Sequence, residues 1–135
     1  MKKLDKEILF KGIVVHGLKV GRKLGFPTAN ILVDNIDQLN VSNGVYVGKV
    51  YYDNKSYDGL VNIGIKPTFN LNEKKRTIEV HILNFNENIY GEHLTLHLSH
   101  FLRYEKAFST QESLINQIHE DIKLAKSITE QSILV

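Results

Sequence analysis

The stretch GVYVGKVYY, Gly44–Tyr52, followed by the turn residues Asp53–Lys55, decides the fold class of this chain. Valine and tyrosine recur through it, and β-branched and aromatic residues favour strands. A second strand-forming run, Tyr57–Ile65, follows the turn at once. Asp and Asn tolerate the backbone conformations of a tight turn. We therefore expect these two runs to pair as an antiparallel hairpin.

Four more strands are predicted on either side of this hairpin. Strict alternation of apolar and polar residues marks two of them, and short β-branched runs mark the other two. They are Phe10–His16, Ala29–Val33, Thr77–Asn84 and His93–Phe101. The segments between them are expected to be irregular: a loose charged leader over Met1–Glu7, a polar connection over Asp34–Asn43 and a long loop over Gly64–Lys75.

The C-terminal part of the chain changes to a helical period. Leu114, Ile118, Ile122 and Ala125 recur at helical spacing, and Ser109 with Glu112 three residues later forms a capping box. Strands crowded before one terminal helix, without a βαβ rhythm, favour a mainly β fold. We expect residues 1–135 to form a single domain, a closed six-stranded antiparallel barrel with the helix packed outside it or across one end.

Composition excludes several function classes. Lys and Arg total 17 against 15 Asp and Glu, so the formal net charge of +2 predicts no polyanionic partner, and we expect no nucleic acid. The absence of cysteine excludes disulfides and thiolate metal sites and suits a reducing compartment. Apolar runs are too short for a membrane span, so a cytoplasmic protein without a membrane partner is expected. The basic run Lys74–Arg76 is interpreted as a solvated loop, and its alternative role is to attract phosphates.

The densest chemical signal lies in the ten residues Gly21–Asn30, GRKLGFPTAN. Gly21 and Gly25 allow the backbone to approach a ligand closely, so the amides between them could form an anion-binding nest. Arg22 and Lys23 would add positive charge. The alternative is a basic surface loop followed by an edge strand, and for a short Gly-rich basic run that alternative is the more frequent one.

Thr28 and Asn30 add the second half of this signal. Side chains alternate along an extended segment, so the Thr28 hydroxyl and the Asn30 amide oxygen are expected on one face. Two hard neutral oxygens suit a partly hydrated Mg²⁺. The pattern therefore indicates a nucleotide site that lacks a carboxylate of its own.

Glu79 is the candidate for proton transfer. It lies in the middle of a predicted strand between Ile78 and Val80, where it either faces solvent or lies in a cleft and takes a proton from a hydroxyl nucleophile. A carboxylate in such a strand is more often on the solvated face than in a cleft. His81 lies on the same face and could orient Glu79, although a half-buried imidazole with a hydrogen bond is the simpler interpretation.

Two further groups of residues are candidate sites. His93, His97 and His100 have a helical spacing within a predicted strand, which makes a zinc site improbable. Arg103, Lys106 and Phe108 lie between the last strand and the helix. A pair of cations beside an aromatic ring could hold a phosphate or a planar ring there, or the segment could be a surface connector.

With these residues set out, the chain resembles the riboflavin kinase family, either the small independent enzymes or the carboxyl-terminal module of the bacterial bifunctional riboflavin kinase and FAD synthetase proteins. The resemblance runs over about 120 residues and depends on many short motifs in a fixed order. They are Gly12–Gly17, Gly25–Asn30, Gly44–Tyr46, Asn62–Gly64, Pro67–Phe69, Glu79–His81, Tyr90–Gly91 and Leu102–Arg103.

This resemblance implies a Greek-key barrel that transfers the γ-phosphate of MgATP to the terminal ribityl hydroxyl of riboflavin, giving FMN. It implies Glu79 as general base and Thr28 and Asn30 as ligands of Mg²⁺ and of the ATP phosphates. The nucleotide would also contact Gly17, Gly21, Arg22, Gly25 and Tyr90, and the flavin would contact Arg103, Lys106 and Phe108. Phosphoryl transfer needs mainly positioning and charge neutralisation, so one base, one metal and one cradle suffice.

The sequence also departs from the family. The loop between Gly17 and Gly25 is short, and Arg22 stands where other members place Lys. A nucleotidyltransferase module is missing, so FAD synthesis is not expected, and a monomer or a domain of a longer chain is expected. Two alternatives are a flavin-binding regulatory module without turnover and an oligonucleotide-binding barrel.

Overall fold

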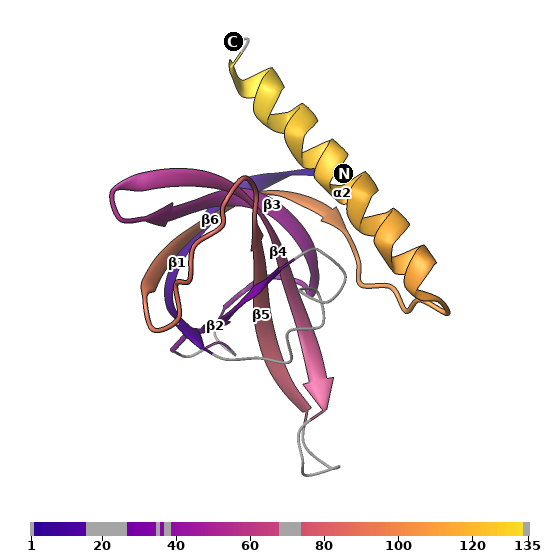
Figure 1. The fold of residues 1–135 in the computed structure, drawn as a ribbon, viewed down its shortest axis with the longest axis horizontal. Coiled ribbons are helices and arrows are strands. Elements are labelled where there is room, and N and C mark those ends of the chain that lie inside the picture. The colour runs from indigo at the N-terminus through magenta and orange to yellow at the C-terminus, as the bar shows by residue number, and fades with distance from the viewer. Residues whose placement is uncertain (1, 16–26, 35, 37–38, 68–73, 134–135) are drawn as a thin grey trace. The chain divides into compact units, whose positions relative to one another are not determined.

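A computed structural model describes residues 2–15, 27–34, 36, 39–67 and 74–133, and side chains for these ranges except 66–67, 74–75 and 130–133. It divides into two compact units, Met1–Glu105 and Lys106–Val135. Within the described ranges, the first unit contains six strands and the second contains one helix (Figure 1). The strands are β1 (Lys2–Val15), β2 (Ala29–Leu32), β3 (Gly44–Tyr52), β4 (Lys55–Pro67), β5 (Lys74–Ile82) and β6 (His93–Arg103).

The strands close into an antiparallel barrel in the order β1-β2-β5-β4-β3-β6, with β6 pairing back to β1. The mainly β, six-stranded barrel predicted from the sequence is therefore confirmed. Its interior contains the alternate apolar residues of every strand, among them Val50, Val61, Ile78 and Leu96, each no more than 1% exposed. The residues between them along each strand point to the outer face, and this alternation decides where the polar side chains lie.

The β3–β4 hairpin forms as predicted. Its two-residue turn, Asp53 and Asn54, has φ values of 51° and 61°. Positive φ at both central residues is the type I′ pattern, whose twist matches that of the flanking strands. The resulting register pairs Gly44 with Ile63 and Tyr52 with Lys55.

Strand β1 begins much earlier than the sequence indicated. The charged segment Met1–Glu7 was expected to be a loose leader, but β1 starts at Lys2, which pairs with Phe101 of β6. The register shifts between Lys3 and Ile8, so the two parts of β1 pair with β6 across an irregularity. Backbone hydrogen bonds to β6 extend the strand, although the side chains of this segment are polar and mostly exposed. A prediction from hydrophobic periodicity cannot detect a strand of this kind.

The expected loop over Gly64–Lys75 is also shorter than predicted. β4 continues to Pro67 and β5 begins at Lys74, with Pro67 paired to Lys74, so the two strands form a long ribbon (Figure 1). Gly64 and Pro67 suggested a loop because both are rare in strand interiors, yet both are tolerated towards the end of a hairpin. Residues 68–73 lie outside the described part of the chain.

The run Lys74–Arg76 is likewise part of β5 and not a solvated loop. Arg76 is half-buried, and its guanidinium donates to Asn43 Oδ1 (2.9 Å), to the Leu39 carbonyl (2.8 Å) and to the Val41 carbonyl. The planar guanidinium serves several acceptors at once, which a lysine ammonium does less well. Arg76 thereby fixes the connection between β2 and β3 to β5.

The helix of the second unit, α2 (Gln111–Ile133), has a different cap from the predicted one. The Thr110 hydroxyl accepts a hydrogen bond from the Ser113 amide (3.1 Å), so Thr110 is the N-cap in place of Ser109. Glu112 lies in the first turn, where a negative charge is favourable at the positive end of the helix dipole. Both hydroxyl residues suit the cap, and the sequence spacing alone favoured the wrong one of the two.

Candidate active site

The candidate site is built on the register of β2, β5 and β4, which lie side by side in the barrel wall (Figure 1). Glu79 of β5 pairs with Asn30 of β2 on one side and with Asn62 of β4 on the other. Opposed residues of neighbouring strands have Cβ atoms about 5 Å apart and share a face. The carboxylate of Glu79 therefore lies between two neutral amides.

The row of paired residues Asn30, Glu79 and Asn62 faces outward from the barrel. Ile78 and Val80, which flank Glu79, are each 1% exposed and point into the core. Alternation then puts Glu79 on the outer face, where it is partly exposed. The solvated face favoured for Glu79 on sequence grounds is thus the face observed, and it is also the face that carries the other polar residues of the site.

The same row continues across the barrel wall. Asn62 pairs with Val45 of β3, and Val45 pairs with Arg103 of β6. Neighbouring strands lie about 4.8 Å apart, so the row from Asn30 to Arg103 crosses five strands over roughly 19 Å. Strand pairing alone therefore brings Asn30, Glu79 and Arg103 into one line.

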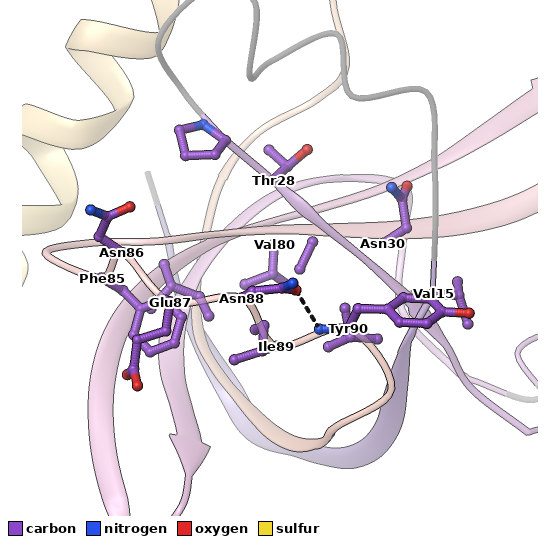
Figure 2. A pocket seen from close by; sticks show the side chains of 14 residues that line it. Val15, Thr28, Asn30, Val80, Phe85, Asn86, Glu87, Asn88, Ile89 and Tyr90 are labelled. Carbon is purple, nitrogen blue, oxygen red and sulfur yellow. Dashed lines mark hydrogen bonds between the residues drawn. The ribbon is translucent and has the colours of Figure 1, made fainter.

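Thr28 and Asn30 project to the same side of β2, as Figure 2 shows. Both are half-buried. His81 donates from Nδ1 to the Pro27 carbonyl (2.8 Å) and so ties β5 to the residue before Thr28. The interpretation of His81 as a hydrogen-bonded imidazole is confirmed, and its position helps to fix the start of β2.

A pocket of about 550 Å³ lies beside β2 (Figure 2). Apolar side chains of β1 and β5 form part of its wall, and Thr28 and Asn30 contribute to the rim. Its lining residues are Val14, Val15, Pro27, Thr28, Ala29, Asn30, Val80, Ile82, Phe85, Asn86, Glu87, Asn88, Ile89 and Tyr90. An apolar wall with a polar rim fits a flat ring that carries a polar tail.

The loop after β5 supplies the opposite wall of this pocket. Its start is held by Phe85, whose ring packs edge-on against Tyr57 (centroids 4.9 Å apart) and Tyr52 (6.1 Å). Its end is held by β1, because the Gly91 amide donates to the Val14 carbonyl and the Val14 amide donates to the Glu92 carbonyl (both 2.9 Å). The wall is therefore anchored at both ends.

Tyr90 lies within this loop and lines the pocket, and its role as part of a nucleotide wall stays a prediction. Tyr90 is 56% exposed, and its backbone amide donates to Asn88 Oδ1 (3.2 Å, dashed in Figure 2). Gly91 has φ of 82°, a left-handed conformation that glycine adopts without strain, so the chain can turn back to β1 directly after Tyr90.

The residues expected on the flavin side fall in both units. Arg103 ends β6, is partly buried and donates from Nη1 to the Tyr104 carbonyl (3.2 Å). Lys106 and Phe108 belong to the second unit, where Lys106 Nζ donates to Gln117 Oε1 (3.3 Å). Their grouping around a flavin stays a prediction. The predicted nucleotide residues Gly17, Gly21, Arg22 and Gly25 lie outside the described residues.

The donor set beside Glu79 suits a hard divalent cation. A hydroxyl and an amide oxygen on one side of β2 are ligands that such a cation accepts together with phosphate oxygens and water. Over the part of the chain that the structure describes, no group of three or more His, Asp or Glu side chains converges as a metal site. Of the histidines of β6, His97 donates to Glu7 Oε2 (2.7 Å).

Sequence reasoning missed three of these features. Asn62 had no assigned role, because its position opposite Glu79 depends on the register of the long β4–β5 ribbon. Phe85 had none, because its contacts come from a distant hairpin. The polar rim residues Asn86–Asn88 had no assigned role either, and the density of Asn and Glu around Phe85 is the signal that could have indicated a ligand wall.

The closed antiparallel barrel, with a carboxylate between two asparagines on its outer wall and a pocket beside it, places the chain among small β-barrels that have a polar site on the wall. Comparison with known proteins is more specific. The flavokinase family, described as riboflavin kinase, matches residues 4–129. The chain therefore belongs to the riboflavin kinase family.

Individual relatives agree with this assignment. The chain is 44% identical over 126 residues to the bifunctional riboflavin kinase/FMN adenylyltransferase of Buchnera aphidicola subsp. Schizaphis graminum, covering 93% of this chain and 40% of that protein. The riboflavin kinase structure from Trypanosoma brucei superposes with a TM-score of 0.69 at 25% identity, covering 93% of this chain and 81% of that one. The chain thus spans about two fifths of the bifunctional relative.

A third relative bears on partners. The protein named RNA-binding riboflavin kinase RibR of Bacillus subtilis is 39% identical over 114 residues, covering 84% of this chain and 48% of that protein. The absence of a nucleic-acid partner therefore stays an untested prediction for this chain. Among the described residues, no helix combines the length and apolar character needed to cross a membrane.

Proposed function

We propose that this chain transfers the terminal phosphoryl group of ATP to the terminal ribityl hydroxyl of riboflavin, producing FMN and ADP. The observation that supports this proposal most directly is the row of Asn30, Glu79 and Asn62. Asn30 lies at the rim of the pocket, and Asn62 lies on the other side of Glu79, towards Arg103. This arrangement supports a nucleotide on one side of a carboxylate and an acceptor on the other.

In this proposal Glu79 is the general base. It accepts the proton of the ribityl hydroxyl while that oxygen forms a bond to the γ-phosphorus and the bond to the ADP oxygen breaks. The partial exposure of Glu79 leaves it accessible to a hydroxyl brought along the outer face of the barrel. A carboxylate that takes and later releases one proton suffices for this reaction.

The pocket holds the nucleotide. Its apolar wall, including Val14 and Ile89, suits a base ring, and its rim directs a phosphate chain towards Thr28 and Asn30. Those two oxygens would hold Mg²⁺, which supplies neutralisation of the phosphate charge. Tyr90 offers an exposed ring face at the edge of the same pocket.

On the first unit, the flavin side is assigned to Arg103, whose guanidinium suits the phosphate of the product. The roles of Lys106 and Phe108, which belong to the second unit, stay a prediction from the family resemblance. The reaction needs no membrane, and a cytoplasmic location agrees with its soluble substrates.

Incubation of the purified protein with riboflavin, ATP and Mg²⁺, followed by chromatographic separation of riboflavin from FMN, tests the proposal. FMN is expected to appear in proportion to the protein added, and to stop appearing when a chelator removes the metal. Binding of both substrates without any FMN would reject the kinase and favour a flavin-binding regulatory module.

A further inference from the structure

Asn62 stands next to the proposed base on the side that the nucleotide pocket does not occupy. It pairs with Glu79, and its own neighbours on β4, Val61 and Ile63, are buried at 1% and 0% exposure. Asn62 is therefore on the outer face, and its side chain is exposed there. The pocket is lined by Asn30, on the other side of Glu79, and not by Asn62.

The geometry of phosphoryl transfer suggests a function for the side of Glu79 on which Asn62 lies. In phosphoryl transfer the attacking and leaving oxygens lie roughly in line with phosphorus. If the phosphate chain arrives from the pocket past Asn30, the acceptor hydroxyl must arrive at Glu79 from the opposite direction. Along the row that direction leads to Asn62, about 5 Å away on the neighbouring strand.

The chemistry of Asn62 suits a polyol and not a phosphate. Its amide carries both a donor and an acceptor and no charge, so it can bond a hydroxyl in either sense without neutralising the adjacent carboxylate. Beyond Asn62 the row continues to Val45, which is 5% exposed, and then to Arg103. A chain of hydroxyls next to the reacting one would meet Asn62 before it reaches any other polar side chain of this row.

We propose that Asn62 binds the acceptor, through the hydroxyl adjacent to the one that is phosphorylated, and so determines specificity for a polyol side chain. This inference rests on the proposed kinase function. It assigns to Asn62 a contact with the substrate, in contrast to the metal and phosphate role proposed for Asn30 on the opposite side of Glu79.

Two substitutions with side chains of matched shape test the contact between Asn62 and the acceptor. Asn62→Thr and Asn62→Val both place β-branched residues in a strand, which tolerates them well, and differ only in a hydroxyl against a methyl group. A lost neutral hydrogen bond corresponds to roughly a threefold to tenfold effect. We expect Asn62→Val to lower kcat/KM for riboflavin by about that factor at saturating MgATP, and Asn62→Thr to retain most of it.

Three further measurements distinguish a substrate contact of Asn62 from a general structural effect: the KM for MgATP, a control variant and a modified flavin. KM for MgATP should be unchanged in both variants, and Ser56→Ala, an exposed position elsewhere on β4, should behave as wild type. A flavin whose side chain lacks the hydroxyl next to the terminal one should be a poorer acceptor for wild type, but should lose nothing further in Asn62→Val. Equal kcat/KM values for the Thr and Val variants, or equal changes towards ATP and riboflavin, would overturn the proposal.

A second measurement keeps this test independent of turnover. Quenching of riboflavin fluorescence reports binding without phosphoryl transfer, and Asn62→Val should weaken it relative to Asn62→Thr. If wild type produced no FMN while this difference persisted, the kinase proposal would fail and the acceptor contact would stand. If FMN formed and the two variants bound riboflavin equally, the acceptor contact would fail alone.

Discussion

At the scale of single residues, Glu79 is the centre of the proposed reaction. Replacing it by Gln retains the size of the side chain and removes the base. General-base catalysis typically contributes roughly 10²- to 10⁴-fold, so kcat for FMN formation should fall by about that factor while nucleotide binding changes little. Glu120→Gln, which removes an exposed carboxylate of α2 outside the row and outside the pocket lining, is the control. Undiminished turnover in Glu79→Gln would remove Glu79 from this role.

His100 is a residue whose surroundings make stability depend on pH in the acid range. Burial lowers its pKa below the ordinary value, and Lys3 lowers it further while Glu7 opposes both. The folded state therefore resists protonation of a group that the unfolded chain protonates near pH 6.5. The stabilising contribution of a neutral His100 is present above that pH and is lost as the pH falls through the lowered value.

His100→Gln should accordingly reduce the acid sensitivity of folding. We expect the difference in unfolding midpoint between pH 7.5 and pH 5.5 to be smaller in the variant than in wild type, as measured by thermal denaturation. His119→Gln, on the exposed surface of α2, serves as a histidine control and should leave that difference intact. A variant as acid-sensitive as wild type would contradict the assignment to His100.

At the scale of elements, the loop between β5 and β6 depends on aromatic packing for its position. Phe85 contacts Tyr52 and Tyr57 of the β3–β4 hairpin and also lines the pocket. Phe85→Ala removes these edge-on contacts, each worth roughly 0.5–1.5 kcal/mol. KM for ATP should rise about threefold to tenfold, and KM for riboflavin should change less, in steady-state assays that vary one substrate at a time.

Tyr51→Ala is the matched control for this effect, because Tyr51 belongs to the same hairpin, is 42% exposed and makes none of the described ring contacts with Phe85. An equal rise of KM for ATP in both variants would indicate a general loosening of the hairpin. The position of the pocket wall would then not depend on Phe85.

At the scale of the whole barrel, closure depends on close approach between strands at Gly12. A Cβ at this position would meet the Ile31 side chain and lie 2.8 Å from the Leu32 carbonyl oxygen. Gly12 pairs with Leu94 of β6, and the next residue, Ile13, pairs with both β2 and β6 to complete the ring. Gly12→Ala should therefore lower the free energy of unfolding by about 1–3 kcal/mol, the usual cost of overpacking.

Urea denaturation of Gly12→Ala measures this cost. Lys11→Ala, at the exposed neighbouring position, should change stability by less than about 0.5 kcal/mol. If Gly12→Ala had the same free energy of unfolding as wild type, β1 and β2 could separate slightly without opening the barrel.

Much of this architecture could be predicted from the sequence because it depends on local patterns. Alternating apolar residues indicated the strands, Asp53 and Asn54 indicated the tight turn, and the motifs around Asn30 and Glu79 indicated the family. The start of β1 and the length of the β4–β5 ribbon were predicted wrongly. Both depend on backbone hydrogen bonds to a partner strand, which polar residues make as well as apolar ones.

The sequence by itself determined the class of fold and the chemical types in the site: a carboxylate at Glu79 and neutral oxygens at Thr28 and Asn30. Only the tertiary structure decided that Asn30, Glu79, Asn62 and Arg103 share one row. Register between strands follows from the pairing of segments distant in sequence, whereas alternation along one strand is a property of that strand alone. The position of Asn62 opposite the base is therefore visible only in the closed barrel.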